Sequence, residues 1–261
     1  MNNEETVAAV SGQGQSRVPS LILLKAGSQS PPIFMAHGLG STVADLLPLA
    51  SNLPVAHPIY GLQERGMDGV DAPLDRIEAM AEFHLAAIRQ LQPHGPYLLI
   101  GYSFGGLVSL EIARRLSTAG EPIALLALLD SYPYRSYLPP LQSLRLLVRL
   151  AKLRLALILR ATGTEGEATP HQLQHVKYAQ LVAWRAYRPH FYDGKISFVK
   201  ASIDSFLPDD PVAVWTSLVK EIRLEAVPGD HLAMLTTHAE AVAHVLLRYL
   251  EEAGVTGSNG D

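Results

Sequence analysis

The chain has 261 residues, of which 48% are hydrophobic and 18% are charged, and its formal charge is −4. This composition is typical of a globular protein and excludes extended disorder for most of the chain, and the Lys and Arg residues are too scattered to favour a nucleic-acid partner. The absence of cysteine excludes disulfides and thiolate sites, and the first residues lack the pattern of a secretory signal. Because charged residues also interrupt the longest apolar stretch, we expect a cytoplasmic protein without a transmembrane segment.

Short apolar runs alternate with helical patterns from residue 21 onward. The expected strands cover residues 21–24, 32–36, 58–62, 97–101, 123–129, 195–201 and 222–227, and the expected helices cover residues 42–51, 75–91, 107–116, 211–220 and 237–252. This alternation predicts an α/β fold, in which a mostly parallel central sheet is flanked by helices.

One domain at residues 20–253 is expected, between flexible tails at residues 1–19 and 254–261, because both ends are polar and lack periodicity. A long helical region at residues 141–188 interrupts the alternation of strands and helices. It is interpreted as the main part of a helical lid, inserted at about residues 133–190. Such a lid would cover the carboxyl edge of the sheet, where open α/β sheets bind their ligands.

The most informative motif is YLLIGYSFGG at residues 97–106, in which an apolar strand pattern ends in Gly101, Ser103 and Gly105. It fits the GxSxG nucleophile elbow, where a serine hydroxyl is presented at a sharp strand-to-helix turn and small flanking residues allow close approach of the backbone. The alternative is that Ser103 only begins a helix packed on the core, but chance matches usually lack the flanking strand and helix. The motif therefore predicts a serine hydrolase of the α/β-hydrolase fold, with Ser103 as nucleophile.

A serine nucleophile needs a histidine base, which a carboxylate orients and stabilises when it is charged. In α/β-hydrolases both partners follow the serine, in the order serine, acid, histidine. Among the later histidines, His231 lies in VPGDHLAML, a glycine-containing loop after a predicted strand, whereas His238 and His244 lie in a helical pattern. His231 is therefore the predicted base.

The acid has two candidate positions. Asp130 directly ends the apolar run 123–129, where an unpaired charge would be costly, although it could also be a turn or capping aspartate. Asp204, Asp209 and Asp210 follow the strand at residues 195–201, the position that the general fold favours. Capping of the helix at residue 211 explains either Asp209 or Asp210. The residues by themselves leave both positions open.

Acyl transfer also needs hydrogen-bond donors for the developing oxyanion. One is expected to be the amide of Phe104, which follows the nucleophile, and the other the amide of Leu39 or Gly38 in the loop HGLGS at residues 37–41. His37 precedes the serine, so it is expected to brace this loop rather than to act as the base.

Four segments carry a specific resemblance: HGLGS, GYSFGG, LLALLDSYP and PGDHLAML, in this order. They resemble the thioesterase domains that end nonribosomal peptide and polyketide assembly lines, over roughly residues 20–250. The resemblance implies that Asp130 is the acid. It also implies that Ser103 takes an acyl or peptidyl chain from the phosphopantetheine thioester of a carrier protein, and that water or an internal nucleophile then releases the chain.

Three residues refine this resemblance. Phe104 and Gly106 favour the terminal, product-releasing kind of thioesterase over free-standing editing enzymes. Ser41 stands where many relatives carry a second glycine, which leaves open which amide of the loop donates to the oxyanion.

The predicted lid combines charge with an apolar surface. Arg145, Arg149 and Lys152 form a cationic stripe, interpreted as a solvated helix face, as a docking site for an acidic carrier protein, or as a contact with an anionic membrane surface. The apolar remainder predicts a channel for a hydrophobic acyl substrate. No metal or organic cofactor is expected, because the closely spaced pair His171 and His175 has no third ligand nearby.

Three functions therefore compete. The first is the carrier-dependent thioesterase, the second is a general carboxylester hydrolase with the same three residues, and the third is a catalytically silent α/β-hydrolase fold that binds a ligand or partner. The presence of a serine, an acid and a histidine in the expected order disfavours the third.

Overall fold

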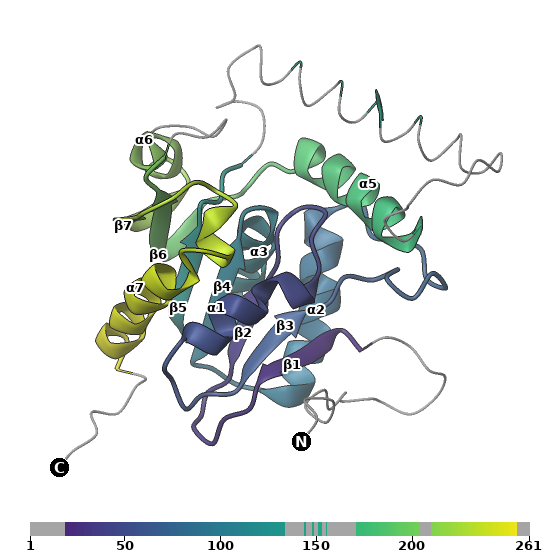
Figure 1. Cartoon of the computed structure of the whole chain (residues 1–261). Coiled ribbons are helices and arrows are strands. Elements are labelled where there is room, and N and C mark those ends of the chain that lie inside the picture. The colour runs from purple at the N-terminus through teal and green to yellow at the C-terminus, as the bar shows by residue number, and fades with distance from the viewer. Residues whose placement is uncertain are drawn as a thin grey trace, which may run out of the picture.

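The computed structural model describes residues 19–133, 171–203 and 210–254, together with residues 144, 148, 151, 152 and 155 of the predicted lid. These residues form a seven-stranded sheet with the order β1-β3-β2-β4-β5-β6-β7 (Figure 1). The strands are β1 (Leu21–Lys25), β2 (Ile33–Ala36), β3 (Ile59–Leu62), β4 (Tyr97–Tyr102), β5 (Ile123–Leu129), β6 (Tyr192–Ala201) and β7 (Val219–Val227). The helices are η1 (Val43–Leu46), α1 (Leu47–Asn52), α2 (Ile77–Leu91), α3 (Phe104–Thr118), α5 (His171–Ala186), α6 (Pro211–Trp215), η2 (Ala233–Leu235) and α7 (Ala239–Glu252).

The sheet is mostly parallel, as the alternation of strands and helices predicts. Strand β1 pairs antiparallel with β3, and each of the other neighbouring pairs is parallel. Strands β2, β4 and β5 occupy the interior of the sheet, and β4 is buried along its whole length. A strand covered on both faces needs apolar residues on both, which is why YLLIGY has no polar alternation.

Helices cover both faces of the sheet (Figure 1). One apolar cluster joins β4 and β5 to α2 and α3, and it includes residues at the end of α5 and in α6. The second cluster joins the opposite face to α1 and α7. In Figure 1, α5 lies beyond the ends of α2 and α3, on the side of the molecule toward which the chain leaves β5. No helix among the described residues is long and apolar enough to cross a membrane.

One predicted helix boundary is wrong. The helix expected at residues 211–220 ends at Trp215, and Val219 already belongs to β7, which was expected to begin at residue 222. Strand β7 lies at the edge of the sheet and buries few of its side chains, so its polar residues Lys220 and Glu221 do not show the alternation that identifies a half-buried strand.

Candidate active site

The central strand β4 ends in a sharp turn at Ser103. β4 ends at Tyr102 and α3 begins at Phe104, so a single residue reverses the chain direction. Ser103 has φ 53° and ψ −120°, a backbone conformation that L residues rarely adopt and that costs about 1–3 kcal/mol. A hydrogen bond from the Ser103 amide to the Leu129 carbonyl, 2.8 Å long, ties the turn to β5. The core packed around β4 and β5 therefore holds Ser103 in this conformation.

The glycines of the motif are required by close contacts. A Cβ atom on Gly101 would lie 2.4 Å from the Cα atom of Gly106, in the first turn of α3. A Cβ atom on Gly105 would lie 2.5 Å from the carbonyl oxygens of Ala36 and His37. Both distances are far below van der Waals contact, so a larger residue at either position would push α3 away from β2 and β4.

Ser103, His231 and Asp130 form one hydrogen-bonded chain, although they are far apart in the sequence. The Ser103 hydroxyl lies 3.0 Å from Nε2 of His231, and Nδ1 of His231 lies 2.8 Å from Oδ2 of Asp130. Because a carboxylate only accepts, Nδ1 carries the proton and Nε2 is left to accept from the Ser103 hydroxyl. This is the arrangement in which an imidazole can remove the proton of a serine.

Asp130 is the candidate acid that the structure places in this chain. It is 3% exposed, and its φ of 46° turns the chain sharply at the end of β5. Its amide donates to the Val199 carbonyl over 2.8 Å, and the indole of Trp215 donates to the carbonyl of the next residue, Ser131. Asp210 instead caps α6 by accepting from the Ala213 amide, while Asp204 and Asp209 lie outside the described residues.

Tyr102 is a residue of this site that the sequence analysis missed. Its hydroxyl donates to the backbone carbonyl of His231 over 2.7 Å, and its ring stacks on the imidazole at a centroid distance of 4.9 Å. The residue between Gly101 and Ser103 in the motif thus holds His231 in place. The only sign of this role in the sequence was that the residue there is aromatic.

The loop at residues 37–41 follows β2 and passes next to Ser103. A Cβ atom on Gly38 would lie 3.4 Å from the Cβ atom of Ser103. Nδ1 of His37 donates to the Gly38 carbonyl over 3.0 Å, and the Ser41 hydroxyl donates to the same carbonyl over 2.8 Å. His37 is buried, and this burial lowers its pKa, so it contributes a neutral ring that braces the loop.

The amides expected to bind an oxyanion lie on both sides of this turn. Phe104 is the first residue of α3, where backbone amides have no partner within the helix. In the facing loop, the Gly40 amide donates to Oε1 of Gln180 in α5 over 2.8 Å, so it is already used. This leaves Leu39 and Gly38 as the candidate donors of the loop.

The remaining site predictions concern a metal site and the cationic stripe of Arg145, Arg149 and Lys152. Among the described residues, no group of three or more His, Cys, Asp or Glu side chains is gathered to hold a metal ion. His171 and His175 are exposed at the start of α5, with their Nε2 atoms 3.1 Å apart. Lys152 is exposed, whereas Arg145 and Arg149 lie outside the described residues.

Comparison with known proteins identifies the family of the chain. The family model for the thioesterase domain matches residues 31–249. A dimodular nonribosomal peptide synthase of Bacillus subtilis (strain 168) is 37% identical over 122 residues, which cover 47% of this chain and 5% of the synthase. The polyketide synthase PksR of the same organism is 39% identical over 118 residues, or 45% of this chain and 4% of that protein. The chain therefore spans only a few per cent of the length of these relatives.

A solved structure shows the same fold. The NocB thioesterase domain, in covalent complex with a fluorophosphonate nocardicin G analog, superposes with a TM-score of 0.65 and is 25% identical. The match covers 85% of this chain and 95% of that domain. The chain therefore belongs to the thioesterase-domain family, of the type found in nonribosomal peptide and polyketide synthetases, and has the α/β-hydrolase fold.

Proposed function

We propose that this chain is a serine thioesterase that takes an acyl, polyketide or peptidyl chain from the phosphopantetheine thioester of a carrier protein onto Ser103. It then releases the chain by hydrolysis or cyclisation. The observation that carries this proposal is the hydrogen-bonded chain of Ser103, His231 and Asp130 beside a loop that presents backbone amides. Family membership supports the thioester as the bond that is cleaved.

In the first half of the reaction, the Ser103 oxygen attacks the thioester carbonyl carbon while Nε2 of His231 takes the hydroxyl proton. The negative charge on the former carbonyl oxygen is stabilised by the amide of Phe104 and by that of Leu39 or Gly38. Asp130 stabilises the imidazolium through Nδ1. When the intermediate collapses, the carbon–sulfur bond breaks, and the phosphopantetheine sulfur leaves as a thiol with the proton from His231.

In the second half, His231 deprotonates the attacking group. Water gives a free acid, and a hydroxyl or amine within the bound chain gives a cyclic product. In both cases the bond to Ser103 breaks and its oxygen regains a proton from His231. We also propose that the protein itself needs no metal or organic cofactor for this chemistry.

The carrier protein is the proposed macromolecular partner, and the similarity to a dimodular nonribosomal peptide synthase and to a polyketide synthase supports this. A hydrophobic acyl channel under the predicted lid, and a cytoplasmic location, remain predictions from the sequence. Phe104 and Gly106 favour the terminal, product-releasing kind.

The experiment compares an acyl N-acetylcysteamine thioester with the oxygen ester of the same acyl group. The thioester is expected to have the higher kcat/KM, and a fluorophosphonate is expected to label Ser103. Preferred turnover of the oxygen ester would show a general carboxylester hydrolase. Folded protein without an adduct at Ser103 would show a binding protein.

A further inference from the structure

The side chain of Gln180 connects α5 with the loop at residues 37–41. Gln180 is 0% exposed, and its Oε1 accepts from the Gly40 amide over 2.8 Å. Its Nε2 donates to Oε1 of Glu64, in the segment after β3, at the longer distance of 3.4 Å. A buried amide is costly unless its polar atoms are paired, so both contacts are needed to keep Gln180 in this position.

Glu64 lies in a buried polar cluster with Gln180 and His84. Glu64 is 7% exposed, and burial raises its pKa to about 7. Nε2 of His84 in α2 lies 3.9 Å from Oε2 of Glu64, but burial lowers the pKa of His84 to about 3, so the two do not form an ion pair at neutral pH. Neither ring nitrogen of His84 has a hydrogen-bond partner among the described residues. Glu64 and His84 are connected to the loop at residues 37–41 through Gln180, which contacts both Glu64 and the Gly40 amide.

The hydrogen bonds of the loop fix the two peptide planes on either side of Leu39. The Gly38 carbonyl is held by Ser41 and His37, and because the peptide is planar and trans, this bond also sets the direction of the Leu39 amide on its opposite side. The next plane contains the Gly40 amide, which is held by Gln180. One plane is thus oriented by the loop itself, and the other by a residue 140 positions further along the chain.

We propose that Gln180 is a positioning residue, which orients the oxyanion loop by holding the Gly40 amide and so links the seating of α5 to the catalytic competence of Ser103. This inference rests on the proposed function in that it assumes an oxyanion formed at Ser103. Gln180 does not touch the reacting atoms in this assignment. It acts through the Leu39–Gly40 peptide.

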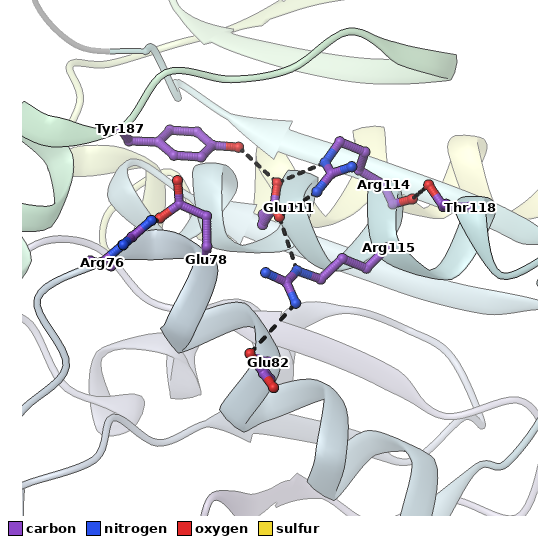
Figure 2. Close-up of polar contacts among 8 residues, drawn as sticks. All are labelled: Arg76, Glu78, Glu82, Glu111, Arg114, Arg115, Thr118 and Tyr187. Carbon is purple, nitrogen blue, oxygen red and sulfur yellow. Dashed lines mark hydrogen bonds and ion pairs between the residues drawn. The ribbon is translucent and has the colours of Figure 1, made fainter.

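Helix α5 has anchors that do not depend on Gln180. The Tyr187 hydroxyl, just after α5, donates to Oε2 of Glu111 in α3 over 3.3 Å (Figure 2). The indole of Trp184 donates to the Tyr132 carbonyl over 3.3 Å. The aliphatic part of Lys177 packs so closely on Gly40 that a Cβ atom there would lie 2.7 Å from Cδ. These contacts should keep α5 in place when Gln180 is changed.

The test is the variant Gln180→Ala, with Tyr187→Phe as matched control. Both remove a buried hydrogen bond of the α5 region, but only the first touches the loop. For Gln180→Ala we expect kcat to fall about 10-fold on the thioester and on the matched oxygen ester, with KM within about twofold of the wild type. The affinity for a boronic acid, whose tetrahedral adduct on Ser103 mimics the intermediate, should fall by the same factor as kcat. For Tyr187→Phe we expect a lower melting temperature and an unchanged kcat.

A second pair of variants tests the supporting contact. Glu64→Ala removes the acceptor for Gln180 and should lower kcat about threefold, whereas Glu64→Gln keeps an acceptor oxygen at the same position and should restore most of the activity. A merely structural role would lower the melting temperature of both variants without separating their kcat values.

Three results would overturn the proposal: an unchanged kcat in Gln180→Ala, a rise in KM without a fall in kcat, or an equal fall of kcat in Tyr187→Phe. Failure of the proposed function looks different, because it concerns the wild type. If the wild type prefers oxygen esters, the same comparison of variants is made on the ester. If it turns over neither substrate, the comparison is made on the rate at which a fluorophosphonate labels Ser103.

Discussion

Asp130 and Glu111 are both buried carboxylates beside the central strands, yet their surroundings differ. Asp130 is 3% exposed, lies in a turn with φ 46°, and accepts from the imidazole of His231. Glu111 is 0% exposed and lies in the middle of α3, where it accepts hydrogen bonds from Arg114, Arg115 and Tyr187 (Figure 2). Burial favours the neutral acid at Glu111, but the two arginines hold its pKa below the usual value.

This difference separates a structural carboxylate from a candidate catalytic one. Arg115 also lies 3.7 Å from Glu82 of α2, so the Glu111 cluster joins α2, α3 and the chain after α5 in unstrained helical backbone (Figure 2). Asp130 instead lies in strained backbone, and its carboxylate accepts a hydrogen bond from the imidazole of His231. Glu111 should therefore contribute mainly to stability, and Asp130 mainly to activity.

The largest effect is expected at Ser103. The variant Ser103→Ala removes the proposed nucleophile and should lower kcat by at least about 10⁴-fold, with a melting temperature close to that of the wild type. Hydrolysis of the N-acetylcysteamine thioester and thermal unfolding measure the two quantities. Turnover near the wild-type rate would exclude Ser103 as nucleophile.

The variant Asp130→Asn should lower kcat by about 10³- to 10⁴-fold, because an amide at this position no longer stabilises the imidazolium and favours the wrong tautomer of His231. The free energy of unfolding of this variant should change by much less than the activation free energy that corresponds to the fall in kcat. A nearly silent Asp130→Asn would reassign the acid, and Asp204→Asn would then be the variant to measure.

The matched variant at the other carboxylate is Glu111→Gln. It removes the charge partner of Arg114 and one of the two acidic partners of Arg115, which also lies near Glu82. It should lower the free energy of unfolding by about 3 kcal/mol, while kcat changes by less than about twofold. Urea unfolding and steady-state kinetics on the same preparation test this. A large loss of kcat without loss of stability would contradict the division between the two carboxylates.

Glu64 differs from both of these carboxylates, because it is buried and has no positively charged neighbour within ion-pair distance among the described residues at neutral pH. Its burial predicts a dependence of stability on pH. Its pKa is raised from 4.5 to about 7 in the folded state, so the unfolded chain releases the proton first as the pH rises. Stability should therefore fall between pH 4.5 and about 7 by up to about 3 kcal/mol relative to Glu64→Gln, which cannot ionise. Urea unfolding of both proteins at several pH values measures the difference. A difference that does not vary with pH would contradict it.

A smaller effect, about 1 kcal/mol, is expected from the loss of one hydrogen bond at Tyr102. The variant Tyr102→Phe keeps the ring stacked on His231 but removes the hydrogen bond to its carbonyl, which is worth about 1 kcal/mol. We expect kcat to fall about fivefold with little change in KM. A fall as large as that of Asp130→Asn would mean that the hydroxyl has a more direct role.

Local patterns predicted much of the fold and of the candidate site. The alternation of strands and helices can be recognised from short stretches of sequence. The turn at Ser103 is also local, because the close contact between Gly101 and Gly106 joins a strand to the helix that directly follows it. The predicted helix at residues 211–220 failed where an edge strand buries too little to show its period. The α/β-hydrolase fold is confirmed, whereas the catalytic roles of Ser103, Asp130 and His231 remain predictions.

Local sequence patterns indicated the family, the turn at Ser103 and a few candidate partners for the serine, because each depends on a few consecutive residues. The resemblance implied Asp130 as the acid, but the residue patterns alone left the choice of carboxylate open, and only the structure shows Asp130, 101 positions before His231, within 2.8 Å of its imidazole. Tertiary structure also decided the use of Gln180, because a glutamine in a helical pattern carries no local mark of the loop that it contacts. Such contacts depend on how the packed elements are placed, and the periodicity of one element does not contain that information.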